Sequence, residues 1–191
     1  MAVTRFEDLD LTRQYTYADY LTWQFTERVE LLRGWVAKMS PAPSRYHQKV
    51  ATNLTRVVAN HFHDASCEVY AAPFDVRLTR TDGGESVVQP DLCVICDVSK
   101  LTERGCTGAP DWVIEVLSPG NTRREIRDKY ALYEESGVRE YWVVDPQHDE
   151  IRTFVLDDGA YRLGPAHFAD DEAPFSPTIF PTLDVLGADV F

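Results

Sequence analysis

The chain has 191 residues, 44% of them hydrophobic, and a formal net charge of −12 at pH 7. This length and composition suffice for one buried core, so we expect a single domain over residues 1–191. No apolar run reaches the roughly 18 residues of a transmembrane helix, and the first ten residues are mixed and charged. The sequence therefore excludes a membrane-spanning helix and predicts a cytoplasmic protein.

The negative charge is unevenly distributed along the chain. Residues Asp145 to Phe191 include ten acidic and only two basic side chains, so most of the net charge lies in the C-terminal part. A charge of −12 disfavours nucleic-acid binding through an overall positive potential. It leaves room for a local basic patch elsewhere.

Apolar spacing and turn residues predict alternating helices and strands in the first half of the chain. In chain order we expect a helix at Tyr17–Trp23 capped by Thr16, two strands within Arg28–Met39 that turn at Arg33-Gly34, a long helix at Ser44–His63, extended segments at Cys67–Leu78 and Val87–Cys96 broken at Pro73 and Pro90, and a loop at Thr81–Glu85 between them.

The second half continues this alternation. We expect a strand at Asp111–Leu117, a helix from Asn121 to Ser136 that ends at Gly137, a buried strand at Glu140–Val144, a hairpin of Ile151–Leu156 and Tyr161–Leu163, and a short apolar end at Val185–Phe191. Strands alternating with helices predict an α/β fold, a mixed central sheet flanked by helices.

The four cysteines include a Cys-x-x-Cys pair, Cys93 and Cys96, which in other contexts signals zinc or redox chemistry. Here both residues lie in an apolar, strand-like run. Residues three apart on a strand point to opposite faces, so the two thiols should diverge. We expect both to be buried structural thiols.

A charged residue inside an apolar strand is the clearest functional signal. In Asp111–Leu117, Glu115 shares a face with Val113 and Leu117. A buried carboxylate is costly unless it is neutral, paired or bound to a metal, so Glu115 is either a satisfied core residue or a metal ligand. Asp91 begins the preceding strand, and the two acids could converge at one rim, where two oxygen ligands suit Mg²⁺. Alone, Asp91 could equally be a turn residue.

Three further residues could join these acids. Lys129 shares an apolar helix face with Ile126 and Tyr133, so it leans inward and needs an anionic partner, unless it snorkels at the edge of that face. Glu30 is a charge between apolar residues of a short strand. His47 lies on the inward face of its helix, where a lone histidine is more often a satisfied core residue.

The order and spacing of these segments resemble the Uma2 family, also called domain of unknown function 820, within the PD-(D/E)xK nuclease superfamily. The matching segments are Glu30-Leu-Leu-Arg-Gly34, inward His47, Pro90-Asp91-Leu92, Val113-Ile-Glu115-Val-Leu-Ser-Pro119 and Asp128-Lys-Tyr followed by Gly137 and Glu140-Tyr-Trp-Val-Val-Asp145. The resemblance covers a core of about residues 17–186. It implies a restriction-endonuclease-like fold and metal-dependent hydrolysis of phosphodiester bonds.

The resemblance also assigns roles to individual residues. Asp91 and Glu115 would hold Mg²⁺ or Mn²⁺, and Glu30 matches the N-terminal acid as a further metal ligand. The usual pattern would place the lysine at position 117, where this chain has Leu117. The family moves the lysine to the next helix, which matches Lys129. With His47, these residues form the expected catalytic set.

The sequence leaves two kinds of function open. The first is a Mg²⁺-dependent endonuclease that acts on nucleic acid, with DNA favoured as substrate. The second is a catalytically silent member of the same fold that acts as a regulatory or protein-association module. A thiol enzyme built on His47 and a cysteine is disfavoured, because no cysteine has an activating environment. Hydrophobic residues near Trp23 and Phe191 could form a homodimer interface.

Overall fold

The structure, a computed structural model, describes residues 2–39, 43–79 and 83–191. Its elements are the 3₁₀ helix η1 (Phe6–Asp8), α1 (Tyr17–Tyr20), β1 (Val29–Leu32), β2 (Trp35–Lys38), α2 (Arg45–Phe62), β3 (Glu68–Ala71), β4 (Asp75–Thr79), β5 (Glu85–Val88), β6 (Leu92–Ile95), the 3₁₀ helix η2 (Val98–Lys100), β7 (Leu101–Thr102), β8 (Gly105–Thr107), β9 (Trp112–Val116), α3 (Arg123–Ser136), β10 (Glu140–Asp145), β11 (Glu150–Asp157), β12 (Ala160–Phe168) and α4 (Gly187–Val190).

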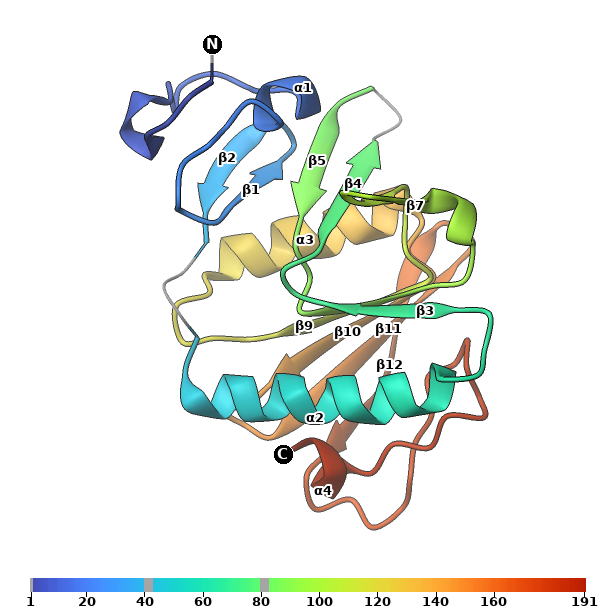
Figure 1. Ribbon diagram of the computed structural model, residues 1–191. Coiled ribbons are helices and arrows are strands. Elements are labelled where there is room, and N and C mark those ends of the chain that lie inside the picture. The colour runs from blue at the N-terminus through green and yellow to red at the C-terminus, as the bar shows by residue number, and fades with distance from the viewer. Residues whose placement is uncertain (1, 40–42, 80–82) are drawn as a thin grey trace.

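The strands form two mixed six-stranded sheets. Sheet 1 has the order β2-β1-β5-β4-β8-β7, and sheet 2 has the order β12-β11-β10-β9-β6-β3. Helices α2 and α3 cover opposite faces of sheet 2 (Figure 1). The predicted α/β class with helices flanking a mixed sheet is therefore confirmed, and sheet 1 is an additional layer beside α3.

Strand alternation explains how sheet 2 is buried on both faces. Trp112 and Ile114 of β9 pack in the cluster that contains α2, whereas Val113 packs in the cluster that contains α3. Strand β10 lies parallel to β9, and α3 makes the connection between them. Such a crossover needs a helix of this kind, because parallel neighbours cannot be joined by a tight turn.

The two prolines that break the extended segments mark the passages between the sheets. Residues Ala72-Pro73 connect β3 of sheet 2 to β4 of sheet 1, and Gln89-Pro90 connects β5 of sheet 1 back to β6 of sheet 2. The backbone N–H of Ala72 donates to the carbonyl of Asp91, which joins the two passages. Asp91 consequently lies at the junction of the sheets.

Most predicted elements are present, with small differences in their ends. The helix predicted to start at Asn121 begins at Arg123, because the hydroxyl of Thr122, rather than the Asn121 side chain, accepts from the N–H of Glu125 at 3.1 Å. Gly137 ends that helix in the left-handed conformation, as expected. The first two residues of the predicted loop at Thr81–Glu85 lie outside the described residues. Among those described, every helix is too short or too polar to cross a bilayer.

The expectation of a free structural thiol is confirmed for Cys93 and wrong for Cys96. The antiparallel register of β3 and β6, which pairs Glu68 with Ile95, brings Cys67 opposite Cys96, and these two form a disulfide. Cys93 and Cys106 are free and buried. Cys93 packs in the cluster on the α3 side of sheet 2 and Cys96 in the one on the α2 side, so the predicted divergence of the two thiols is confirmed.

A buried carboxylate on β10, Glu140, anchors the C-terminal segment of the chain. Glu140 of β10 is 1% exposed and accepts from Trp142 Nε1 at 2.7 Å and from the N–H of Ile179 at 2.9 Å. Glu140→Ala should lower the free energy of unfolding by about 2–5 kcal/mol, since it leaves the buried Trp142 Nε1–H and the part-buried Ile179 N–H without this acceptor. Urea unfolding measures the loss, and an unchanged midpoint would contradict the anchoring role.

The same residue predicts a dependence of stability on pH. Burial raises the pKa of Glu140 above its ordinary value of 4.5. A group whose pKa is raised on folding adds stability below its unfolded pKa, and that contribution disappears as the pH rises through the folded value. The stability advantage of the wild type over Glu140→Gln should therefore shrink as the pH rises above about 4.5. Urea unfolding of both proteins at several pH values measures it, and a pH-independent difference would contradict it.

Candidate functional site

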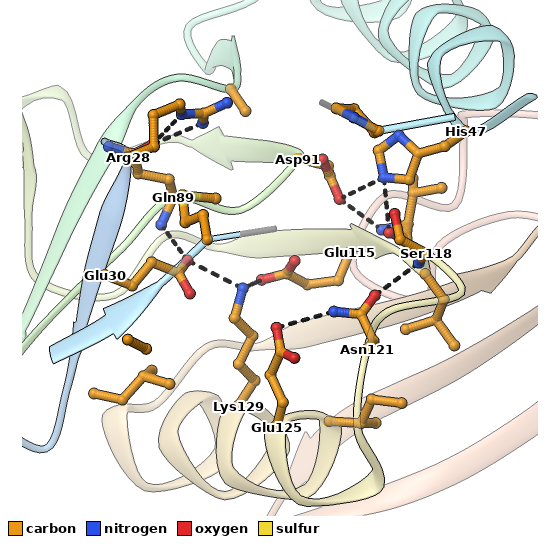
Figure 2. A pocket seen from close by; sticks show the side chains of 18 of the residues that line it. Arg28, Glu30, His47, Gln89, Asp91, Glu115, Ser118, Asn121, Glu125 and Lys129 are labelled. Carbon is orange, nitrogen blue, oxygen red and sulfur yellow. Dashed lines mark hydrogen bonds and ion pairs between the residues drawn. The ribbon is translucent and has the colours of Figure 1, made fainter. Parts of the chain in front are cut away.

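All five residues of the expected catalytic set line one cavity of about 1230 Å³. Glu30 comes from β1 of sheet 1, His47 from the first turn of α2, Asp91 from the passage into β6, Glu115 from β9 and Lys129 from α3. Figure 2 shows their polar ends directed toward a common centre. The fold therefore brings together side chains that are far apart in the sequence.

These five residues form a polar cluster, and its centre is a buried ion-pair triad. Lys129 Nζ lies 3.1 Å from Glu30 Oε1 and 2.9 Å from Glu115 Oε1. The Tyr133 hydroxyl donates to the same Glu115 oxygen at 2.7 Å. Lys129 is 7% exposed, so it is an inward lysine with two carboxylate partners and does not snorkel to the surface.

Burial and neighbouring charges set the protonation of this triad. Burial raises the pKa of Glu115 to about 7; Asp91 and Glu30 push it in the same direction, and Lys129 opposes them. Burial alone would lower the pKa of Lys129, but Glu115 and Glu30 outweigh it and raise that pKa. Lys129 therefore stays cationic, whereas the charged form of Glu115 is costly and depends on a cation beside it.

Strand register places the two principal acids side by side. In the antiparallel pairing of β6 with β9, Leu92 is opposite Ile114. Continued by one residue, this register places Asp91 level with Glu115. The Asp91 carboxylate accepts from the N–H of Val116, so the two acids lie on neighbouring strands at the same end of sheet 2.

A histidine and a backbone amide fix the orientation of Asp91. Its Oδ2 accepts from the N–H of Val116 at 2.8 Å and lies 3.6 Å from His47 Nε2. His47 Nε2 also lies 2.9 Å from the Val116 carbonyl. Hydrogen bonding and charge from Asp91 raise the pKa of His47 against the effect of burial. His47 therefore contacts Asp91 and the end of β9 and holds the two together.

The donor set fits a hard divalent cation. Among the described residues, the hydrogen bonds to Asp91 use Oδ2 and those to Glu115 use Oε1, so the second oxygen of each carboxylate has no protein donor. No group of three or more His, Cys, Asp or Glu side chains within the described residues is arranged to hold a metal by itself. Two carboxylates with the remaining positions left to water or phosphate are the usual environment of Mg²⁺.

Sequence reasoning missed several residues that support the cluster. Tyr133 was identified only as part of an apolar helix face, yet its hydroxyl binds Glu115. The backbone N–H of Gln89 donates to Glu30 Oε1 at 2.8 Å. Asn121 accepts from the N–H of Ser118 and donates to Glu125, which shapes the loop after β9. The position of Gln89 directly before Pro90-Asp91 was the only signal in the sequence for its role.

Comparison with known proteins places the chain in a family. Residues 17–186 match the profile of the Uma2 family, which is described as "Putative restriction endonuclease". An "Uncharacterized protein slr1290" from Synechocystis sp. is 25% identical over 149 residues, which cover 76% of either chain. The fold is similar to the crystal structure of "a putative nuclease belonging to DUF820" from Anabaena variabilis, with a TM-score of 0.72, 19% identity and coverage of 93% of this chain and 97% of that one.

The profile match extends from the start of α1 to the residue before α4, so it includes both sheets, the two long helices and every residue of the cluster. On this evidence, the chain belongs to the Uma2 family.

Proposed function

We propose that this protein is a nuclease that hydrolyses phosphodiester bonds in nucleic acid and requires Mg²⁺ or Mn²⁺. The observation that carries the proposal is the convergence of Asp91, Glu115 and Lys129 in one cavity, where one oxygen of each carboxylate accepts no hydrogen bond from the described part of the chain. The family's description as a restriction endonuclease supports the same reaction class and favours DNA as substrate.

In this proposal, the carboxylates of Asp91 and Glu115 hold the cation, and Glu30 either contributes a further ligand or orients a water molecule. The bound cation would activate water and offset charge on the phosphate. Lys129 donates to the phosphoryl oxygens as negative charge develops on them. Water is added across the P–O bond, so the products are one phosphate end and one hydroxyl end.

The remaining contacts keep the ligands in position. His47 bridges Asp91 and the Val116 carbonyl, and Tyr133 fixes one oxygen of Glu115, which leaves the other oxygen for the cation. We therefore assign His47 and Tyr133 as positioning residues. Rigid support of this kind matters because metal ligands lose affinity when their outer contacts are removed.

A second function has one specific observation in its favour. Lys129 forms ion pairs with both Glu30 and Glu115, so part of the negative charge of the site is balanced without a metal, as a silent regulatory or protein-association module would require. The two functions differ in metal affinity. Calorimetric titration with Mg²⁺ and Mn²⁺ should give one saturable binding event if the site is catalytic, and no binding heat above that of Asp91→Ala if it is silent.

The direct test is a cleavage panel of single- and double-stranded DNA and RNA with Mg²⁺ or Mn²⁺, with and without EDTA. The wild type should cleave at least one substrate only when the metal is present, and Asp91→Ala should not. Glu140→Gln is the matched control, because it also changes a buried carboxylate but lies outside the cavity. Cleavage that persists in EDTA or in Asp91→Ala would overturn the proposal.

A further inference from the structure

We propose that the cavity binds a single, unpaired DNA strand, with Trp35 as a base-stacking platform and Arg28 and Arg56 as phosphate contacts. This inference rests on the proposed nuclease function and specifies its substrate. All three residues line the cavity that contains Glu30, Asp91 and Glu115.

Trp35 is an exposed aromatic side chain on the catalytic side of sheet 1. It lies on edge strand β2, where it pairs with Leu32 of β1, and Ala37 pairs with Glu30. Because alternate residues of a strand share a face, Trp35 projects from the same face as Glu30. It is 46% exposed, whereas Trp112 and Trp142 are fully buried.

A large indole that stays exposed at the wall of a polar cavity leaves apolar surface in water. A nucleobase is a flat ligand with polar edges and would cover that surface by stacking, an interaction that tolerates any base. Trp35 is thus suited to bind a base while the backbone of the same strand runs on toward Glu115 and Asp91.

Two cations of the cavity are available to phosphate groups. Arg28 directly precedes β1, and Arg56 lies on α2. Among the residues that the structure describes, Arg28 donates only to the neutral amide of Gln89 and Arg56 only to the backbone carbonyl of Asp189. Both side chains are exposed. The other basic residues of the cavity wall have carboxylate partners among the described residues: Arg33 with Glu135, Lys38 with Glu27, Arg124 with Asp128 and Lys129 with Glu30 and Glu115.

Arg28 and Arg56 lie on different walls of the cavity. Figure 2 shows Arg28 on the sheet 1 side and the α2 residue His47 on the opposite side, with Asp91 and Glu115 between them. Arg56 lies further along the same helix as His47. A strand that crosses the cavity would therefore meet a free cation on each side of the proposed metal site.

Stacking on Trp35 favours an unpaired strand over a duplex. Bases within a duplex cover each other's faces, and only an unpaired or terminal base offers its face to an aromatic side chain. The low exposure of Glu30, Glu115 and Lys129, at 3%, 9% and 7%, requires the scissile phosphate to enter the cavity. The net charge of −12 also opposes the higher phosphate density of a duplex more strongly than that of a single strand.

The test measures binding separately from cleavage. Asp91→Asn serves as the background, with EDTA present, so that the oligonucleotide stays intact. Fluorescence anisotropy then compares a labelled single strand of DNA with the duplex and the RNA strand of the same sequence. Trp35→Ala, Trp35→Phe, Arg28→Gln and Arg56→Gln are made in this background. Two controls lie outside the cavity: Leu163→Ala, which removes a 67% exposed side chain of β12, and Arg104→Gln on the β7–β8 turn.

We expect the single DNA strand to bind more tightly than the duplex. Trp35→Ala should weaken that binding about tenfold or more, and Trp35→Phe should retain most of it because the ring remains. Each arginine variant should lower the dependence of log affinity on log salt by about 0.7, the value for one phosphate contact on a single strand. Neither control should have an effect, and thermal unfolding should show that every variant is folded.

Three outcomes would overturn the inference: tighter binding of the duplex, unchanged affinity in Trp35→Ala, or a tenfold preference for the RNA strand. These outcomes are separate from a failure of the proposed function, which would appear as wild-type protein that neither binds Mg²⁺ nor cleaves any member of the substrate panel. A protein that cleaves duplex DNA with Mg²⁺ and is indifferent to Trp35→Ala would retain the function and refute only this substrate assignment.

Discussion

Replacing Asp91 with asparagine should abolish Mg²⁺ binding and nucleic-acid cleavage together, while the protein remains folded. The amide oxygen of asparagine can still accept from the N–H of Val116, which Asp91 Oδ2 accepts at 2.8 Å in the wild type. The variant therefore keeps the contact that holds the end of β9. It lacks the negative charge that, with Glu115, would attract the cation.

Calorimetry with Mg²⁺ and the cleavage panel give the two readouts for Asp91→Asn, and the urea unfolding midpoint shows that it is folded. We expect no saturable binding and a loss of cleavage by a factor of about 10³ or more, because metal and charge stabilisation are lost together. Glu140→Gln should match the wild type in both readouts. Wild-type Mg²⁺ affinity in Asp91→Asn would remove Asp91 from the metal site.

Replacing Lys129 with methionine should reduce cleavage by about 10²–10³, the usual effect of removing one donor to developing charge, without weakening Mg²⁺ binding. A protonated amine has no lone pair for a metal, and its charge repels a nearby cation. The structure adds a consequence for stability. Because Lys129 is the shared partner of Glu30 and Glu115, its removal leaves two buried carboxylates uncompensated, which typically costs about 3–5 kcal/mol.

The combined loss of cleavage and of stability in Lys129→Met can be separated by adding Mg²⁺. Mg²⁺ should restore part of the stability lost in Lys129→Met, because the cation replaces the missing positive charge, and its affinity should equal or exceed that of the wild type. The double variant Lys129→Met with Glu30→Gln should be more stable than the single variant. Lys100→Met, whose ammonium donates to the Ala109 carbonyl outside the cavity, controls for loss of a lysine.

Cleavage by Mg²⁺-loaded Lys129→Met separates two roles for the lysine. If Lys129 only balanced the charges of Glu30 and Glu115, the loaded variant would cleave at the wild-type rate. If it assists the reaction, cleavage stays low although the metal is bound and the fold is restored. The first result would contradict the assignment of Lys129 as a catalytic group.

Local pattern alone predicted the elements and the inward charges. The alternation in Asp111–Leu117 places Glu115 on a defined face of β9, and the helical spacing of Ile126, Lys129 and Tyr133 directs the lysine inward. Both follow from fixed geometric periods of strand and helix, so they need no information about distant residues. The helix caps at Thr16 and Gly137 could be predicted for the same reason.

Only the tertiary structure decided which residues meet. Pairing of β6 with β9 sets Asp91 opposite Glu115, and sheet 1 brings Glu30 to Lys129, 99 residues further along the chain. The split into two sheets at Pro73 and Pro90 also escaped prediction, because a proline reports a break in pairing and not the sheet to which each half belongs.

The same reason explains why the disulfide and the exposure of Trp35 could not be predicted from the sequence. The partner of Cys67 depends on the register of β3 against β6, and the exposure of Trp35 depends on β2 lying at the edge of its sheet. Long-range register results from the packing of whole elements around the core, and local sequence carries little information about it. The sequence by itself determined which side chains are available for chemistry, and the packing of the two sheets determined that they form one site.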